Sequence, residues 1–165
     1  MKLVKSALMG IAFTISTSSF AVDGYKNWKF EMTEKEAREV HKCQWYKDDG
    51  FLACDDFTFG GTNTGVGLLF IDDKLKNIFI QVPTEMAGGT LTKLMEKYKV
   101  LSRPSTKELR DQKPNMPFDF IFEDGSITFR AVYDGNANEE DFLIYGKDFD
   151  RNYLKLQNNK LKDDL

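Results

Sequence analysis

The sequence contains few of the residues that enzymes most often use for catalysis and metal binding. Its 165 residues include one histidine, His41, and two cysteines, Cys43 and Cys54. A Ser-His-Asp triad or a histidine metal site would depend on that single histidine, and the G-x-S-x-G and H-E-x-x-H motifs are absent. We therefore expect no enzymatic activity, no catalytic residue, no metal site and no cofactor.

Basic charge is not in excess either. The chain has 23 lysines and arginines against 26 aspartates and glutamates, which gives a formal net charge of −3 at pH 7. Nucleic-acid-binding domains usually carry a basic surface, so we expect no nucleic-acid partner. Hydrophobic residues make up 41% of the sequence, which is enough to build a core and excludes a disordered chain.

No run of apolar residues is long enough to cross a membrane. The first 21 residues instead have the pattern of a cleaved signal peptide. Lys2 and Lys5 precede an apolar stretch over residues 7–15, and small residues occupy positions −3 and −1 of the cleavage site. We predict that residues 1–21 are removed and that residues 22–165 form a single α+β domain in the periplasm or the medium, without insertion into a membrane.

The two cysteines suit an oxidising compartment. Cys43 and Cys54 enclose ten residues. A lone close pair of this kind usually forms a disulfide, which stabilises a small protein by about 3 kcal/mol. A redox-active pair is the alternative, but the spacing is not C-x-x-C. We predict a structural disulfide.

The hydrophobic pattern of the first half predicts one helix and three strands. Thr33 and Glu36 form a capping box that starts a helix ending near Cys43. Period-two alternation then predicts strands at residues 51–59, 66–71 and 75–82.

The second half repeats this order. Thr90 predicts the start of a helix with a one-sided apolar stripe. Residues 103–117 hold three of the four prolines and predict a long loop with at most one helical turn. Three strands follow, with Asp124-Gly125 as the turn between the first two, and a helix ends the chain. The predicted fold is α+β, with one antiparallel sheet of about six strands from two αβββ units and the helices packed on one face.

Two segments are candidates for contact with a partner. Residues 60–65 consist of glycine and polar residues and suit a flexible binding loop, although turn geometry alone explains the glycines. Two aromatic residues closely follow Cys43, where a constrained loop would make them good anchors. The alternative for these two aromatics is that they cover the edge of the core. The candidate contact residues are therefore Trp45, Tyr46, Thr62, Asn63 and Thr64.

Three acidic segments could in principle act on a substrate or hold an ion. Asp55-Asp56 lies in a predicted strand, where adjacent side chains point to opposite faces. Asp72-Asp73 lies at a predicted turn, where aspartate is common for backbone reasons. Residues 134–141 begin like a calcium loop but place Glu139 where such a loop needs glycine. A calcium site and a plain hairpin loop both stay open there.

Four short features carry a resemblance to known proteins. Phe30-Glu31-Met32-Thr33 precedes the capped helix, a cysteine follows that helix, Phe70-Ile71-Asp72-Asp73-Lys74-Leu75 spans a turn, and Leu94-Met95-Glu96-Lys97-Tyr98 lies in the next helix. This layout resembles small secreted bacterial α+β proteins of the β-lactamase-inhibitor-like and outer-membrane-assembly lipoprotein groups. The resemblance implies a protein that binds other proteins and catalyses nothing. The sequence departs from the lipoprotein group because it has no lipid-bearing cysteine.

These observations together predict a non-enzymatic secreted or periplasmic protein that binds another protein, whose identity no motif indicates. Inhibitors, immunity proteins and accessories of envelope assembly belong to this class. The alternative is a periplasmic protein that binds a small ligand or a carbohydrate.

Overall fold

A computed structural model describes residues 22–111, 113–133 and 139–163 of the chain. The first part contains β1 (Gly24–Tyr25), β2 (Trp28–Lys29), α1 (Glu34–Val40), β3 (Tyr46–Asp48), β4 (Phe51–Phe59), β5 (Thr62–Ile71) and β6 (Lys74–Val82). The second part contains α2 (Thr84–Lys97), β7 (Val100–Ser102), α3 (Thr106–Arg110), β8 (Pro117–Phe122), β9 (Ile127–Tyr133), β10 (Glu139–Tyr145) and α4 (Phe149–Asp163).

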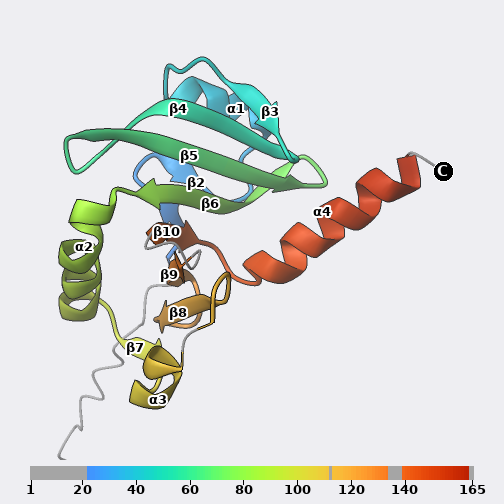
Figure 1. The fold of residues 1–165 in the computed structure, drawn as a ribbon. Helices are drawn as coiled ribbons and strands as arrows, with labels where there is room; N and C mark the ends of the chain where they lie inside the picture. Colours follow the sequence, from blue (N-terminus) through green and yellow to red (C-terminus); the bar gives the residue numbers. More distant parts are fainter. Residues whose placement is uncertain (1–21, 112, 134–138, 164–165) are drawn as a thin grey trace, which may run out of the picture.

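The strands from β3 to β10 form one antiparallel sheet in the order β3-β4-β5-β6-β10-β9-β8-β7 (Figure 1). In each half of the chain, a helix precedes four strands that run from one edge of the sheet toward the centre. The last strands of the two halves, β6 and β10, pair with each other. The predicted α+β class and antiparallel sheet are therefore confirmed, and each unit has four strands.

The predicted number of about six strands is wrong, because the sheet has eight. The two extra strands are the edge strands β3 and β7, which have three residues each, all exposed to solvent. A strand that is exposed on both faces shows no alternation between polar and apolar residues. The pattern that predicted the other six strands was therefore absent from these two.

The prediction that all helices pack on one face is also wrong. One face of the sheet, here called the core face, carries Leu52, Leu68, Ile80 and Leu143, and it packs against α1, α2 and the β1–β2 hairpin. The opposite face is here called the open face, and among the described residues the start of α4 covers it, with Phe149 stacked on a ring of β6. Beyond that point α4 extends away from the sheet (Figure 1).

Helix α2 begins six residues before the predicted start at Thr90. It runs through Gly88-Gly89, which lies inside the helix. Met86 and Ala87, which precede the two glycines, pack against the core, and Leu94 is buried further along the helix. This packing on the core face outweighs the poor helix propensity of glycine.

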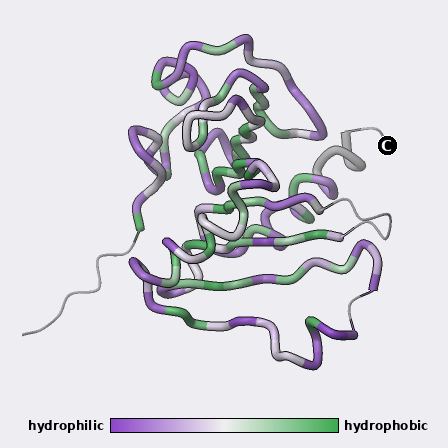
Figure 2. The backbone as a smooth tube through the Cα atoms, turned by 60° about the vertical axis from the view of Figure 1, so that its left-hand side comes forward, coloured by the Kyte–Doolittle hydropathy of each residue, from purple (hydrophilic) through white to green (hydrophobic). Residues whose placement is uncertain are grey.

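In Figure 2 the hydrophilic residues gather mainly at the turns that join the strands.

Helix α1 has only seven residues, and side chains satisfy both of its ends. At its start, the predicted capping box is confirmed by Thr33 and Glu36. At its end, the indole Nε1 of Trp28 donates to the carbonyl of Ala37 over 2.9 Å, and a second indole donates to the carbonyl of His41. These bonds satisfy carbonyls that have no partner within a helix.

The predicted disulfide is confirmed between Cys43, which follows α1, and Cys54 in β4, with a Cα–Cα distance of 6.2 Å. Cys54 is fully buried among the residues of the core face. The disulfide therefore fixes the segment that follows α1 to strand β4.

Breaking this disulfide is expected to destabilise the protein. Reduction with dithiothreitol should lower the free energy of unfolding by about 3 kcal/mol, because the unfolded chain regains the entropy of a closed loop. Urea titrations followed by tryptophan fluorescence measure the change. The variant Cys43→Ala/Cys54→Ala is the control, since its unfolding should not respond to the reductant. An unchanged midpoint of the reduced protein would contradict a structural role.

Asn77, in β6, joins the two halves of the sheet and is fully buried. Its amide nitrogen donates to the carbonyls of Tyr145 and Lys147, and its amide oxygen accepts from Asn152 in α4 over 2.9 Å. Gly146 lies directly against Asn77. A Cβ at position 146 would be 2.6 Å from the amide nitrogen of Asn77 and 2.2 Å from the carbonyl oxygen of Lys76. The end of β10 and the start of α4 are thus fixed to β6 by one buried amide.

Replacing this amide is expected to loosen the connection between the halves. Asn77→Ala should lower the free energy of unfolding by about 2 kcal/mol or more, since it leaves buried polar groups without partners. Chemical denaturation measures this loss. Asn158→Ala, at an exposed position in α4, is the matched control and should stay within about 0.5 kcal/mol. Equal stability of the two variants would show that the buried amide adds nothing.

Candidate functional site

The open face contains a groove of about 640 Å³, which lies over β4, β5, β6 and β10 beside the start of α4. Its volume is in the range of about 300–1,000 Å³ that ligand sites occupy. We call it the aromatic groove because six aromatic residues line it. Tyr46 of β3 lies at its edge, and five rings from four other elements form a cluster, namely Phe51, Phe79, Phe142, Phe149 and Tyr153.

The five rings stack on one another. Phe79 of β6 is 4.4 Å from Phe142 of β10 and 5.6 Å from Phe149 of α4, measured between ring centroids. Tyr153 lies one turn further along α4 and stacks on Phe149 at 6.2 Å and on Phe51 at 5.8 Å. All five side chains are only partly buried. The cluster therefore holds α4 in place and still presents apolar surface to solvent.

Two glycines of β5 keep the groove open between these rings. A Cβ at Gly67 would be 3.2 Å from Cδ1 of Phe51, and a Cβ at Gly65 would be 3.4 Å from the amide oxygen of Gln81. Both glycines face the groove, since their neighbours Val66 and Leu68 point into the core face. Larger side chains here would fill the space that the glycines leave.

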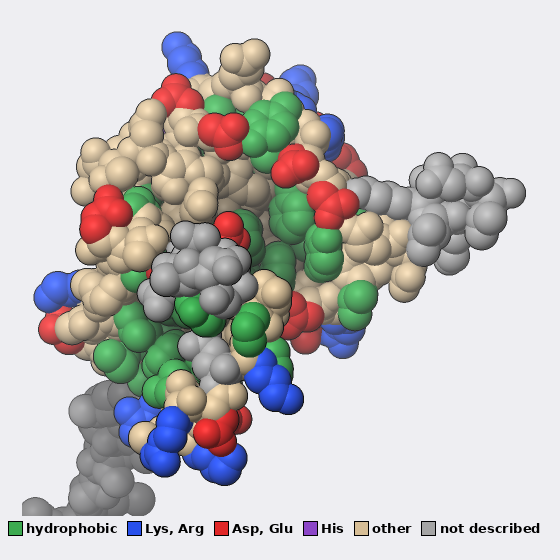
Figure 3. Space-filling view, viewed as in Figure 1, with side chains coloured by type: hydrophobic (Ala, Val, Ile, Leu, Met, Phe, Trp, Pro, Cys, Tyr) green, Lys and Arg blue, Asp and Glu red, His purple; other side chains and the backbone are tan. Residues whose placement is uncertain are grey.

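Carboxylates surround the aromatic groove. Among the described residues, its lining contains five acidic residues and one cation, Arg130. In Figure 3, which views this face, hydrophobic side chains lie in a hollow with red carboxylates around them. The acidic residues are Asp48, Asp49, Asp55, Glu140 and Asp150.

Arg130 of β9 does not offset this negative charge, because it is paired with two carboxylates. Its guanidinium donates to both oxygens of Asp119 in β8, at 2.8 and 2.7 Å, and to both oxygens of Asp150 in α4, at 2.8 and 3.0 Å. It also lies over the ring of Phe149, 5.6 Å from the centroid. Arg130 therefore fixes the start of α4 to the sheet.

Two hydrogen bonds to rim carboxylates affect nearby tyrosines. The hydroxyl of Tyr46 donates to Asp55 over 2.8 Å, and the hydroxyl of Tyr153 donates to Asp49. Each bond raises the pKa of its tyrosine, because the neutral hydroxyl is the form that donates to the carboxylate.

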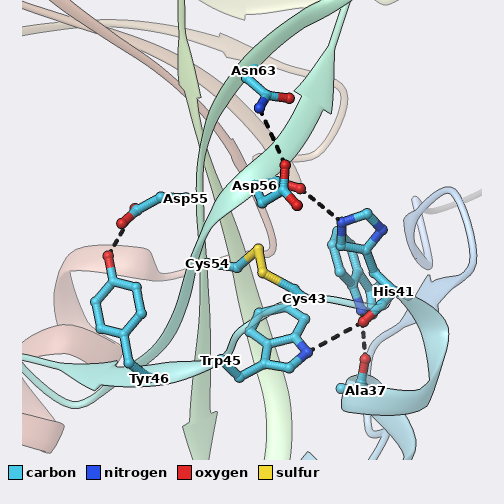
Figure 4. The surroundings of a disulfide bond; sticks show 10 residues. Ala37, His41, Cys43, Trp45, Tyr46, Cys54, Asp55, Asp56 and Asn63 are labelled. Atoms are coloured by element: carbon cyan, nitrogen blue, oxygen red, sulfur yellow. Dashed lines mark hydrogen bonds between the residues drawn. A yellow bond between two sulfur atoms is a disulfide. The ribbon is translucent and has the colours of Figure 1, made fainter.

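The predicted contact residues Trp45 and Tyr46 lie on opposite sides of the sheet. Trp45 packs against the core, with its ring 6.2 Å from that of Trp28, which is the alternative that the sequence left open. Tyr46 begins β3, is 42% exposed and lies at the edge of the aromatic groove, where it bonds to Asp55 (Figure 4 shows this bond). Only Tyr46 of this pair is available to a partner at the groove.

The predicted loop over residues 60–65 is not a loop, because β5 already starts at Thr62 and the turn consists of Gly60-Gly61. Thr64 is buried and its hydroxyl donates to the carbonyl of Gln81 over 2.8 Å. Asn63 is exposed and bonds to Asp56. The glycines serve the turn, and Thr62, Asn63 and Thr64 do not form one surface with Tyr46.

Of the remaining chemical candidates, His41 and Asp56 are in contact through the backbone, since Nε2 of His41 lies 3.1 Å from the carbonyl oxygen of Asp56 (Figure 4). His41 lies beside Trp28 and Phe57 near the disulfide, and Asp55 and Asp56 bond to different partners in different directions (Figure 4). Asp72-Asp73 forms the tight turn between β5 and β6. Within the described ranges, no group of three or more histidine, cysteine or acidic residues could hold a metal ion.

Two predictions fall on parts of the chain about which the structure gives no description. The predicted signal peptide, residues 1–21, lies outside the described residues, and so does most of the predicted calcium loop, at 134–138. Among the helices that are described, none is long and apolar enough to span a membrane.

The groove residues were missed in the sequence, although a signal was present. Segments such as Ile78-Phe79-Ile80 and Phe142-Leu143-Ile144 are apolar on successive positions. Such runs indicate a strand with apolar side chains on both faces. A sheet with helices on one side leaves the second set of apolar residues exposed or only partly covered.

Comparison with known proteins places the chain among relatives. A family model described as "Uncharacterised protein" matches residues 25–164. The chain belongs to this family. The match includes every strand and helix that lines the aromatic groove. A Haemophilus influenzae protein, described as "Uncharacterized protein", is 41% identical over 168 residues, which cover 100% of each of the two chains. No solved structure matches significantly.

Acid is expected to release the start of α4 from the sheet. Hydrogen bonding from Arg130 lowers the pKa of Asp150 below its ordinary value. A carboxylate with a lowered pKa stabilises the folded state above its ordinary pKa, and this effect is lost as the pH falls through the folded value. Hydrogen exchange of α4 amides should therefore accelerate below about pH 4 relative to the amides of β5.

The variant Asp150→Asn should show faster exchange in α4 at neutral pH and no further change in acid. Asp148→Asn is the control, since Asp148 pairs with exposed Arg151 and not with Arg130. It should keep the acid transition. Because Asp150 is 69% exposed, we expect the effect on global stability to stay below about 1 kcal/mol. An identical acid response of the wild type and Asp150→Asn would exclude this pair as the cause.

Proposed function

We propose that the protein binds another protein in the cell envelope or outside the cell, without catalysing a reaction, through the aromatic groove. The observation that carries this proposal is the partly exposed cluster of five stacked rings on a sheet face that, within the described parts of the chain, is covered by the start of α4 alone. Aromatic side chains in a partly covered apolar patch are typical of the energetically important centre of a protein interface.

The pattern of charge supports a partner segment of specific chemistry. The rim carries five carboxylates, and its one guanidinium is already paired with Asp119 and Asp150. A segment that offers an aromatic or aliphatic side chain between lysines or arginines would fill the groove and face carboxylates on its sides. Charge complementarity of this kind mainly raises the association rate and the specificity of binding.

The location rests on two further features. The pattern of residues 1–21 favours export. The Cys43–Cys54 disulfide is compatible with an oxidising compartment. Inhibitors, immunity proteins and envelope-assembly accessories work in such places by binding alone. The proposal covers this class of protein, which the sequence also predicts.

Site-specific crosslinking in the source cell tests the proposal. A benzophenone amino acid at position 81 would replace Gln81, an exposed residue of β6 that lines the groove. We expect ultraviolet light to join it to one protein, identified by mass spectrometry. The same amino acid at Thr58, an exposed position of β4 outside the groove, is the control and should give no adduct. Equal adducts at both positions, or none at position 81, would contradict the proposal.

Variants of the groove then measure its contribution with the purified partner. Gly65→Leu should fill the groove and weaken binding at least tenfold, while Thr58→Leu adds the same side chain elsewhere and should leave the affinity unchanged. Asp48→Asn and Glu140→Gln should slow association, and the wild type should associate more slowly as salt rises. Insensitivity to both Gly65→Leu and salt would place the interface on another surface.

A further inference from the structure

A second groove, of about 620 Å³, lies on the other side of the sheet between α2, the β1–β2 hairpin and the tip of the β4–β5 hairpin. We call it the tyrosine groove, because Tyr25, Tyr98 and Tyr145 line it. Tyr145 points into the core face, so this groove is separated from the aromatic groove by the sheet itself. Its function is therefore independent of the function proposed above.

The bed of the tyrosine groove is apolar. Met86 and Leu94 of α2 and Leu143 of β10 contribute aliphatic surface, and the rings of Tyr25 and Tyr145 lie 4.9 Å apart beside them. One end is closed where the tip of the β4–β5 hairpin meets α2. A Cβ at Gly60 would be 1.8 Å from the terminal methyl group of Met86. This bed suits a hydrocarbon chain.

Five donors at the tyrosine groove have no acceptor in the described parts of the chain, whereas Lys93, which also lines the groove, is paired with Glu96 at 2.7 Å. None of the three tyrosine hydroxyls donates a hydrogen bond there, and neither Lys26 nor Lys97 forms an ion pair there. No described carboxylate lines the groove. Burial raises the pKa of Tyr145, so its hydroxyl stays protonated and able to donate.

The two lysines lie over the aromatic rings that border the groove. Nζ of Lys97 is 4.9 Å from the centroid of Tyr98, and Nζ of Lys26 is 5.3 Å from the centroids of Tyr25 and Phe57. Lys26 reaches this position from a left-handed backbone conformation, with φ of 51°, which costs a residue with a side chain about 1 kcal/mol or more. Glycine or asparagine would fit this turn better. Unpaired ammonium groups at the edge of an apolar bed attract an anion.

We propose that the tyrosine groove binds a single-chain amphiphile with an anionic head, such as a fatty acid. The chain lies along Met86, Leu94 and Leu143, and the head accepts from Lys26, Lys97 and the tyrosine hydroxyls. An apolar bed, unpaired donors and the absence of carboxylates from the described lining together select this chemistry over a cationic or neutral polar ligand.

Calorimetric titration of the oxidised protein tests the proposal, with laurate as the probe. Laurate below its micelle concentration should bind with one molecule per chain. Dodecyltrimethylammonium has a chain of the same length and the opposite charge, and it should bind at least tenfold more weakly. Similar heats for the two surfactants, several molecules per chain, or no heat with laurate would overturn the proposal.

Two neighbouring glycines of α2 provide a matched pair of variants. Gly89 lines the groove and Gly88 does not, and a Cβ at either position meets no heavy atom within 4 Å. Gly89→Leu should weaken laurate binding at least tenfold, while Gly88→Leu should leave it unchanged. Lys26→Gln and Lys97→Gln should each weaken it by up to about fivefold, the effect of an exposed ion pair. Equal binding by both leucine variants would place laurate elsewhere.

The variant Gly65→Leu distinguishes this site from the aromatic groove. It should leave laurate binding unchanged, because Gly65 lies on the open face. Loss of laurate binding in Gly65→Leu, with normal binding in Gly89→Leu, would mean that the aromatic groove takes the chain and would overturn this assignment. Such a result leaves the crosslinking test of the protein partner unaffected.

Discussion

Five residue pairs between β6 and β10, from Ile78–Tyr145 to Val82–Asp141, hold the two halves of the sheet together by backbone hydrogen bonds. Each half completes its own strands from the edge inward, so neither half supplies a partner for its last strand. Asn77 adds buried side-chain bonds from β6 to the end of β10 and to α4. The positions of α4 and of everything on the open face follow from this pairing.

Different helices cover the two faces of the sheet, because the helices occur at different positions along the chain relative to the strands. Helices α1 and α2 precede the strands of their halves and both pack on the core face, where the large apolar residues gather. After β10 the chain turns at Gly146 and continues as α4 on the open face, where Phe149 stacks on Phe79. A single helix covers only part of an eight-stranded sheet, and the aromatic groove lies beside that helix, over β4, β5, β6 and β10.

The sequence carried clear local signals for part of this fold. The Thr33 capping box, the Asp124-Gly125 turn and the Cys43–Cys54 pair were correctly predicted, because each depends on residues close together in the chain. The predicted start of α2 was wrong, because packing of this helix against the core outweighs the low helix propensity of Gly88 and Gly89. The edge strands β3 and β7 were missed because exposed strands have no alternation.

The candidate site was less predictable because it is made by contacts between distant segments. Tyr46 was predicted as a contact residue and does line the groove, but Trp45 belongs to the core. Phe51, Phe79 and Phe142 look like ordinary core residues when each strand is considered alone. Only the pairing of β6 with β10 and the return of α4 bring them together on one exposed surface.

The order of the strands in the sheet, from each edge to the central β6–β10 pair, also has a consequence for folding. Strands β3 to β6 are joined by short turns, and so are β8 and β9, so these hairpins form from residues that are near in sequence. The β6–β10 pairing instead joins Ile80 with Leu143, far apart along the chain, and non-local pairing of this kind is slow. The rings of Phe79 and Phe142 stack diagonally across this pairing. The aromatic groove is therefore complete only when β6 and β10 have paired, because residues of both halves of the chain line it.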